Sequence, residues 1–401
     1  MPSSFSWLDF SDEQRQKTMD IIALFRENDT VDELGIGVVR DTFSDLLFPG
    51  TSTIQTRVKY FLFIPWIYRD LERRKVPSRK INERARQVEI QLIYGLLESG
   101  ETEGVIGAVA KKDLQRIPSR IYWNGLEKWG IRRFSGGIIQ YNRSLDAYYN
   151  SLRFQNKNDD GDLIIGGPRP NWHAGLPEPP DDFPNKATLK LTQPQASYLH
   201  ERLLTAVGES LLTYLVDQQS QIPESGSPWS ISSTQNLPEP VRTWMDHGRN
   251  FSELIWGAPL LYNLMLSEMT QSDQLLKRYQ GRLSEWVGLL RNRWDHFDTW
   301  DREKFWGIVE GEYGQVPTFT KGFINDWWRM ALASPEDIHQ NNKARDLIRN
   351  RERLLKRGQA RLFSQRAREL WGGAAGSSQI DYRWSNGARQ IINDIIEGLN
   401  T

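Results

Sequence analysis

Acidic side chains and a histidine crowd one stretch of the sequence, RWDHFDTWD (293–301). Three aspartates and one histidine are donor groups that can together hold Mg²⁺ or Mn²⁺. They are Asp295, His296, Asp298 and Asp301. Helical spacing places Asp295 and Asp298 on one side of a helix and turns His296 about 100° away from them. A divergent metal-dependent nuclease site near Asp295–Asp301 is therefore one interpretation, and the pattern assigns no residue to catalysis or to a metal.

Few other patterns point to catalysis. The chain has no Cys, which excludes a disulfide scaffold, a zinc ribbon, an iron–sulfur cluster and a cysteine nucleophile. Gly35 and Gly37 are not followed by Gly-Lys-Ser/Thr, so they do not form a phosphate-binding loop. Asp394 and Glu397 lie three positions apart on one helix face, where such a pair is usually solvated. We therefore expect no cofactor, and an enzyme is not the favoured interpretation.

Positive charge gathers in one part of a chain whose net charge is zero. Residues 1 to 50 hold 4 Lys/Arg against 10 Asp/Glu, and residues 51 to 150 hold 18 against 10. Because bulk charge supplies no attraction, any affinity for nucleic acid must come from such a local excess. An acidic arm followed by a basic segment suits a region that meets phosphate.

The most specific part of the basic segment is residues 103 to 141, EGVIGAVAKKDLQRIPSRIYWNGLEKWGIRRFSGGIIQY. The pattern predicts a helix over about 104–115, a break at Pro118 and a second helix, SRIYWNGLEKW (119–129). IRRF and IIQY then alternate around a Ser-Gly-Gly tip, which predicts a β-hairpin. Preceded by a helix at 82–98, this order is that of a winged helix-turn-helix.

In a winged helix-turn-helix, the third helix enters the DNA major groove and the wing lies against the backbone. Arg120 and Lys128 would lie on that helix, and Arg132 and Arg133 on the wing. Two alternatives stay open. Winged helices also bind proteins, and a helix–helix–hairpin unit can serve packing alone.

A second basic segment is KARDLIRNRERLLKRGQARLFSQRAR (343–368), with ten Lys/Arg and two acids. At 100° per residue, four of its cations fall within about 80° of one another. They are Arg345, Arg349, Arg353 and Lys356. Leu347, Ile348, Leu354 and Leu355 fall on the opposite side. Such a helix could track a phosphate backbone, or it could be a solvated face whose cations pair with acids from elsewhere.

The elements that must position these residues are helical by period, so we predict a mainly α fold. A helix at 11–28 is capped by Ser11. The stretch 33–68 predicts a helical hairpin with a Pro49-Gly50 turn, a Thr51–Thr53 cap and a buried aromatic second arm that bends near Pro65. A Pro-rich stretch at 159–194 predicts a linker or surface loop between an N-terminal domain (1–158), which holds the winged-helix-like unit, and a helical C-terminal domain (195–401).

The chain is expected to be cytoplasmic. Its first residues, MPSSFSWLDF, lack the basic and apolar regions of a secretory signal. The longest apolar run, YFLFIPWIY (60–68), is about half the length that a membrane-spanning helix needs.

Four blocks of the sequence together resemble a bacterial family of unknown function. They are SWLDFS (6–11), ELGIGVVRDTFSDLLFPGTSTIQTRVKYFLFIPWIY (33–68), RIPSRIYWNGLEKWGI (116–131) and YRWSNGARQIINDIIEGL (382–399). That family is often encoded in defence islands beside helicases and phospholipase D-like nucleases. The resemblance implies a component of an antiphage system with such partners, and it supplies no catalytic residue.

Together these observations predict a non-catalytic subunit of a bacterial multi-protein antiphage defence system that engages double-stranded DNA or acts as an adaptor. The alternatives are a divergent metal-dependent nuclease of the same system and a pure protein-interaction scaffold.

Overall fold

The computed structural model describes residues 32–153, 169–219, 222–223, 226–231 and 236–401. Within these residues the chain is mainly helical and has no β-strand, only an isolated antiparallel bridge between Arg132 and Trp172. The predicted mainly α class is confirmed. No helix in this part of the chain is both long and apolar enough to span a membrane. The helix predicted at 11–28 lies outside the described residues.

The chain forms two compact units, here called unit 1 and unit 2. Unit 1 comprises residues 1–40 and 247–380, and unit 2 comprises residues 41–246 and 381–401. Two boundaries fall inside helices, in α2 (Gly37–Leu47) and α9 (Glu239–Ile255). This division does not follow the boundary predicted at 159–194, because the described part of that stretch belongs to unit 2.

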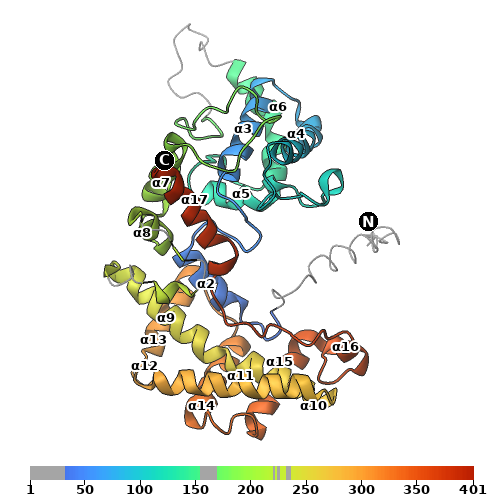
Figure 1. The fold of residues 1–401 in the computed structure, drawn as a ribbon, viewed down its shortest axis with the longest axis vertical. Helices are drawn as coiled ribbons and strands as arrows, with labels where there is room; N and C mark the ends of the chain where they lie inside the picture. Colours follow the sequence, from blue (N-terminus) through green and yellow to red (C-terminus); the bar gives the residue numbers. More distant parts are fainter. Residues whose placement is uncertain (1–31, 154–168, 220–221, 224–225, 232–235) are drawn as a thin grey trace, which may run out of the picture. The chain divides into compact units, whose positions relative to one another are not determined.

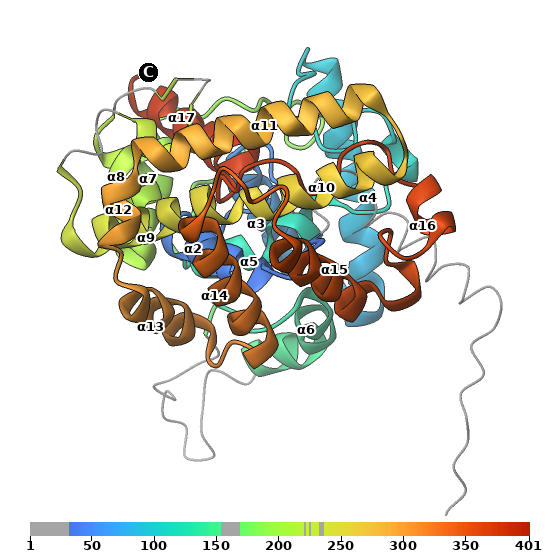
Figure 2. The same cartoon turned by 90° about the horizontal axis from the view of Figure 1, so that it is seen from below.

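Unit 1 is built on α10, whose residues from Gly257 to Ser267 are all buried. Helices α11 and α15 pack against it, and α14 packs on α15 (Figures 1 and 2). The elements of this unit are α10 (Gly257–Met269), α11 (Asp273–Asn292), α12 (Trp294–Asp298), α13 (Arg302–Tyr313), α14 (Thr318–Ala333), α15 (Asn342–Lys356), the 3₁₀ turn η4 (Arg357–Gln359) and α16 (Gln365–Glu369).

In unit 2, α3 packs against α4 and α5, and α17 packs against α7 and α8 (Figure 1). The elements are α3 (Tyr60–Arg73), α4 (Ser78–Glu98), the 3₁₀ turn η1 (Lys111–Asp113), α5 (Pro118–Lys128), α6 (Ile138–Arg153), α7 (Gln193–Val207), α8 (Leu211–Asp217), the 3₁₀ turn η2 (Pro228–Ser230), the π-helical turn η5 (Trp384–Ala388) and α17 (Arg389–Leu399).

The aromatic arm predicted within 33–68 is α3, and its residues from Tyr60 to Tyr68 are all buried. The helix contains Pro65, as the sequence indicated. It begins later than predicted, because the Thr51 hydroxyl donates to the carbonyl of Phe48 (2.7 Å) and so completes the turn after α2. Residues 51–59 are therefore irregular, and the Thr51–Thr53 cluster does not cap α3.

The predicted β-hairpin wing is wrong. Its second arm, IIQY (138–141), is the first turn of α6, which continues to Arg153. Tyr141, Leu145 and Tyr149 recur every four residues and are buried, which is the period of a helix rather than a strand. The helix predicted at 104–115 is also wrong, because only η1 forms there. Gly104 and Gly107 both adopt positive φ values, +79° and +87°, which interrupt a helix.

An aromatic tetrad binds the Pro-rich side of unit 2 to its helices. Four rings contact one another in every pairing, with centroids 5.2 to 6.1 Å apart: Tyr68, Trp123, Tyr141 and Trp172. Beside them, a carboxylate oxygen of Glu72 accepts hydrogen bonds from Asn171 Nδ2 (3.0 Å) and Trp172 Nε1 (3.0 Å). These contacts explain why the segment after residue 168 belongs to unit 2 rather than between two domains.

Replacing Phe61 with Ala should strongly destabilise the protein. The Phe61 ring is fully buried and stacks on Trp129 with centroids 3.8 Å apart and planes 4° from parallel. Loss of such a side chain costs about 3–5 kcal/mol. Urea unfolding of Phe61→Ala beside Ile139→Ala, whose side chain is exposed, measures this cost. Equal stability of the two variants would contradict the packing described.

Candidate nucleic-acid interface

Helix α5 carries the clearest set of exposed cations that the sequence predicted. Arg120, Asn124 and Lys128 follow one another at intervals of four, so they share one face of α5, and all three are exposed. Arg133 is exposed just beyond the helix. Among the described residues, Arg120, Lys128 and Arg133 have no carboxylate in ion-pair or hydrogen-bond contact. Asn124 was not singled out by the sequence reasoning, although its spacing from Arg120 was available.

Arg132, the other predicted wing residue, does not belong to this surface. It is only 2% exposed, and its guanidinium donates to the carbonyls of Gly136 (2.9 Å) and Phe134 and to the Glu127 carboxylate. Glu127 lies on the same face as Arg120, and this ion pair offsets its charge. Burial lowers the pKa of Arg132. Arg132 therefore supports the local fold and cannot reach a duplex.

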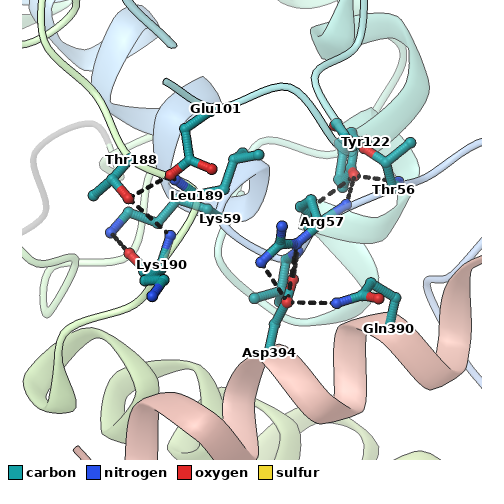
Figure 3. A network of polar contacts seen from close by, with 12 residues as sticks. Thr56, Arg57, Lys59, Glu101, Tyr122, Thr188, Leu189, Lys190, Gln390 and Asp394 are labelled. Carbon is teal, nitrogen blue, oxygen red and sulfur yellow. Dashed lines mark hydrogen bonds and ion pairs between the residues drawn. The ribbon is translucent and has the colours of Figure 1, made fainter. Parts of the chain in front are cut away.

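The inner side of α5 is fixed by the Tyr122 hydroxyl (Figure 3). This hydroxyl accepts hydrogen bonds from the amides of Thr56 (2.9 Å) and Arg57 (3.2 Å) and donates to the carbonyl of Arg57 (2.9 Å). At the end of the helix, Trp129 Nε1 donates to the carbonyl of Pro49 (2.9 Å). The outward face of α5 is thus presented by a helix whose inner face has little freedom.

The irregular segment that receives Tyr122 is itself held by a carboxylate from the far end of the sequence, Asp394 of α17 (Figure 3). Arg57 Nε and the amide of Val58 both donate to Asp394 at 2.9 Å, and Gln390 Nε2 donates to it at the same distance. Burial opposes the charged form of Arg57, but its hydrogen bond to Asp394 raises the pKa of Arg57. Asp394 is 4% exposed, so the expectation of a solvated pair was wrong at this residue.

Lys59 is a second buried group that the sequence reasoning missed. Its ammonium donates to the carbonyl of Lys190 (2.7 Å) and to the side-chain oxygen of Gln195, and burial lowers its pKa to about 8. Nearby, Glu101 accepts hydrogen bonds from the Thr188 hydroxyl (2.6 Å) and the amide of Leu189 (2.9 Å). Figure 3 shows both sets beside the Arg57–Asp394 pair. The Lys59 contacts join the start of α3, and the Glu101 contacts join the chain just after α4, to the segment that leads into α7.

Glu89 of α4 stands at the amino end of α5. Its Oε2 accepts a hydrogen bond from the amide of Ser119 (2.8 Å), and its side chain is fully buried. Its Oε1 has no hydrogen-bond partner within the described part of the chain. Burial raises the pKa of Glu89 to about 7. The side chain satisfies a free amide at a helix start, where negative charge is favourable, but burial opposes that charge.

The predicted cationic row on α15 in unit 1 is largely occupied by local partners. Arg345 pairs with Glu268 and donates to the carbonyl of His339 (2.8 Å). Arg349 pairs with Asp346 at 3.0 Å. The other two members are Lys356, which lies 3.4 Å from Glu33, and Arg353, whose guanidinium lies 5.6 Å from the centre of the Phe363 ring.

The buried face of α15 also differs from the one predicted. Ile348 is buried as expected, but Leu354 is exposed, and Arg351 and Glu352 are buried instead. Arg351 Nε donates to the carbonyl of Leu34 (2.7 Å). The spacing of apolar residues cannot predict a buried arginine that binds backbone carbonyls.

The predicted metal cluster is dispersed. Asp295, Asp298 and Asp301 are exposed, and Asp301 caps α13 by accepting from the amide of Lys304 (2.9 Å). In the residues that the structure describes, no group of three or more His, Cys, Asp or Glu is placed to hold a metal ion.

Comparison with known proteins assigns nearly the whole chain to a family. A family model described as "Family of unknown function (DUF6361)" matches residues 2–396. The chain belongs to the DUF6361 family. The expected membership in a family of unknown function is confirmed, and DUF6361 brings no activity with it. Searches of the curated proteins and of the solved structures found no match.

Replacing Glu89 with Gln should change how stability depends on pH. The folded pKa of about 7 lies above the ordinary value of 4.5. The contribution of the protonated carboxyl is therefore fully present below about pH 4.5 and is lost as pH rises through about 7. Glutamine keeps an oxygen that accepts from Ser119 and carries no charge at any pH.

From about pH 5 to about pH 8, the wild-type protein should lose on the order of 2 kcal/mol of unfolding free energy relative to Glu89→Gln. Urea unfolding of both proteins at each pH gives this difference. Parallel pH profiles would show that Glu89 does not titrate as an uncompensated buried acid.

Proposed function

We propose that this DUF6361 protein is a non-catalytic DNA-engaging subunit of a bacterial multi-protein antiphage defence system, in which a partner carries out the chemistry. The single observation that carries the proposal is the exposed face of α5. Arg120 and Lys128 are held there on a well-packed helix, and neither forms an ion pair among the described residues, although the charge of Arg120 acts on the buried Glu89. Unpaired cations on a rigid element are what phosphate contact requires.

The dimensions of this face suit a nucleic-acid duplex. Arg120 and Lys128 are eight residues apart, or about 12 Å along a helix. Each strand presents one phosphate about every 3.4 Å of duplex axis, so both cations can meet the backbone at once. Asn124 lies between them, and an asparagine can pair with the edge of an adenine in the major groove. Arg133 adds a further cation close to the end of α5.

The cations of α15 contribute less than those of α5 to the proposed duplex contact. Phosphate contact by Arg345 or Lys356 would require each to leave Glu268 or Glu33. Arg349 and Arg353 are more exposed, and they offer charge without base-edge geometry. We therefore assign the main duplex contact to α5.

The defence role and the helicase and phospholipase D-like nuclease partners rest on the resemblance of the four sequence blocks to a family encoded in defence islands. The absence of an assembled metal cluster in the described residues is compatible with chemistry supplied by such a partner.

The double variant Arg120→Gln/Lys128→Gln should weaken duplex binding. Each lost phosphate contact reduces the slope of log K against log salt by about 0.9, so the double variant should lose about 1.8. Fluorescence anisotropy with a labelled duplex of about 20 base pairs at several salt concentrations measures both affinity and slope. The fold should persist, because both side chains are exposed.

Arg73→Gln/Arg74→Gln is the matched control. It removes the same charge from exposed positions of the same unit, but Arg73 and Arg74 are both paired with Asp70. If both double variants lose the same duplex affinity and salt slope, the effect comes from the overall charge of the protein and not from a contact at α5. Unchanged affinity and slope in Arg120→Gln/Lys128→Gln would remove α5 from the DNA contact and favour a protein-interaction scaffold.

A further inference from the structure

A surface at the end of α15 combines an exposed aromatic ring with unpaired arginines. We define it by Arg353, Arg357, Phe363 and Arg366, all exposed and all in unit 1. Among the described residues, none of these three arginines has a carboxylate in ion-pair contact. We infer that this surface, here called the Phe363 platform, binds single-stranded nucleic acid.

The backbone beneath the platform is rigidly held. Glu352 is fully buried, and its carboxylate accepts hydrogen bonds from the amides of Arg361 (2.6 Å) and Leu362 (3.0 Å) and from the Tyr262 hydroxyl (2.6 Å). Leu362 is buried, whereas the next residue, Phe363, is 52% exposed. The ring is therefore presented outward by a segment whose two preceding amides are fixed.

The cations near the ring, one of them in contact with it and two close to it in the chain, favour a polyanionic ligand. Arg353 places its guanidinium 5.6 Å from the ring centre, and Arg357 and Arg366 flank it along the chain. Three acids lie close to these residues in the chain or through their contacts. Glu33 pairs with Arg361, Glu352 binds the backbone, and Glu369 of α16 accepts a hydrogen bond from Gln365 (3.1 Å). Net positive charge is thus available at the surface rather than neutralised within it.

A base-stacking ring among cations distinguishes a single strand from a duplex. Unpaired bases stack on aromatic side chains while cations follow the backbone, and this mode tolerates any sequence because every base has a flat face. In a duplex the bases are stacked on each other, so an exposed phenylalanine gains no stacking contact with them. The platform therefore differs in ligand from the proposed duplex contact on α5, and it does not depend on that proposal.

The test compares Phe363→Ala with Phe319→Ala. Phe319 is 54% exposed and lies under the guanidinium of Arg351 at 5.1 Å, so it matches Phe363 in exposure and in its cation. Arg351, however, is engaged by the carbonyls of Leu34 and Gly35. Anisotropy of a labelled oligothymidylate of about 16 nucleotides, and of its oligouridylate counterpart, measures binding.

Phe363→Ala should weaken single-strand binding by roughly 5- to 150-fold, the range of one lost stacking contact. Phe319→Ala and Phe363→Tyr should bind as the wild type does. Arg357→Gln/Arg366→Gln should reduce the salt slope by about 0.7 per contact. Phe363→Leu keeps the apolar contact without an aromatic face, and it decides the case if Phe363→Ala unfolds.

Several results would overturn the inference. The first is that the wild type does not bind the single strand at low salt. The second is that Phe363→Ala, or a folded Phe363→Leu, binds the single strand as tightly as Phe319→Ala does. The third is that the Phe363 variants lose duplex binding and single-strand binding to the same extent. Preference for the uridylate over the thymidylate would identify RNA as the ligand within the same chemistry. Loss of duplex binding in the α5 variants with single-strand binding intact would separate this inference from the proposed function.

Discussion

The place of α5 depends on the absence of a side chain at Gly125. A Cβ at this position would lie 2.3 Å from the carbonyl oxygen of Gly50 and 2.9 Å from the Phe61 ring. Gly50 is constrained in turn, because its φ is +77° and a Cβ there would meet Trp129 Nε1 at 2.7 Å. Helix α5 thus lies directly on the Pro49–Gly50 turn. The Trp129 hydrogen bond and the Phe61–Trp129 stack require this close approach, and so does the direction in which Arg120 and Lys128 point.

Around this contact, the apolar core of unit 2 also contains buried charged groups. Asp394, Glu89, Lys59 and Arg132 are all buried, and each binds at least one backbone group. Buried charges are tolerated only when they are paired or hydrogen-bonded. Their arrangement means that the irregular segments at 51–59 and 188–190 are ordered by side chains rather than by secondary structure.

Much of the helical framework could be predicted from the sequence, because α2, α3, α4 and α5 carry strong local signals such as the Pro118 start of α5. The hairpin could not be distinguished over the short window 131–142, since alternation over four residues fits a strand and a helix start equally well. Only the longer spacing of Tyr141, Leu145 and Tyr149 decides it. The burial of Asp394 depends on Arg57, 337 residues away, and no local pattern reveals such a partner.

The candidate site was predictable only in part, because the sequence shows helical spacing but not the distant partners of each side chain. Sequence alone placed Arg120 and Lys128 on one helix, and the structure shows them exposed, but exposure of Arg133 and burial of its neighbour Arg132 depend on carbonyls brought together by the fold. On α15, the excess of cations in the sequence did not reveal which of them have partners. The partners of Lys356 and Arg345 are acids distant in sequence, Glu33 and Glu268.

The central claim is that the outward face of α5 touches a DNA duplex. Photocrosslinking tests it most directly, with p-benzoylphenylalanine placed at position 124 and, as a control, at position 186, which is also exposed in unit 2. The account predicts that a labelled duplex crosslinks to the protein from position 124, that unlabelled duplex competes, and that position 186 gives little product. Duplex binding without a crosslink from position 124, or equal yields from both positions, would contradict it.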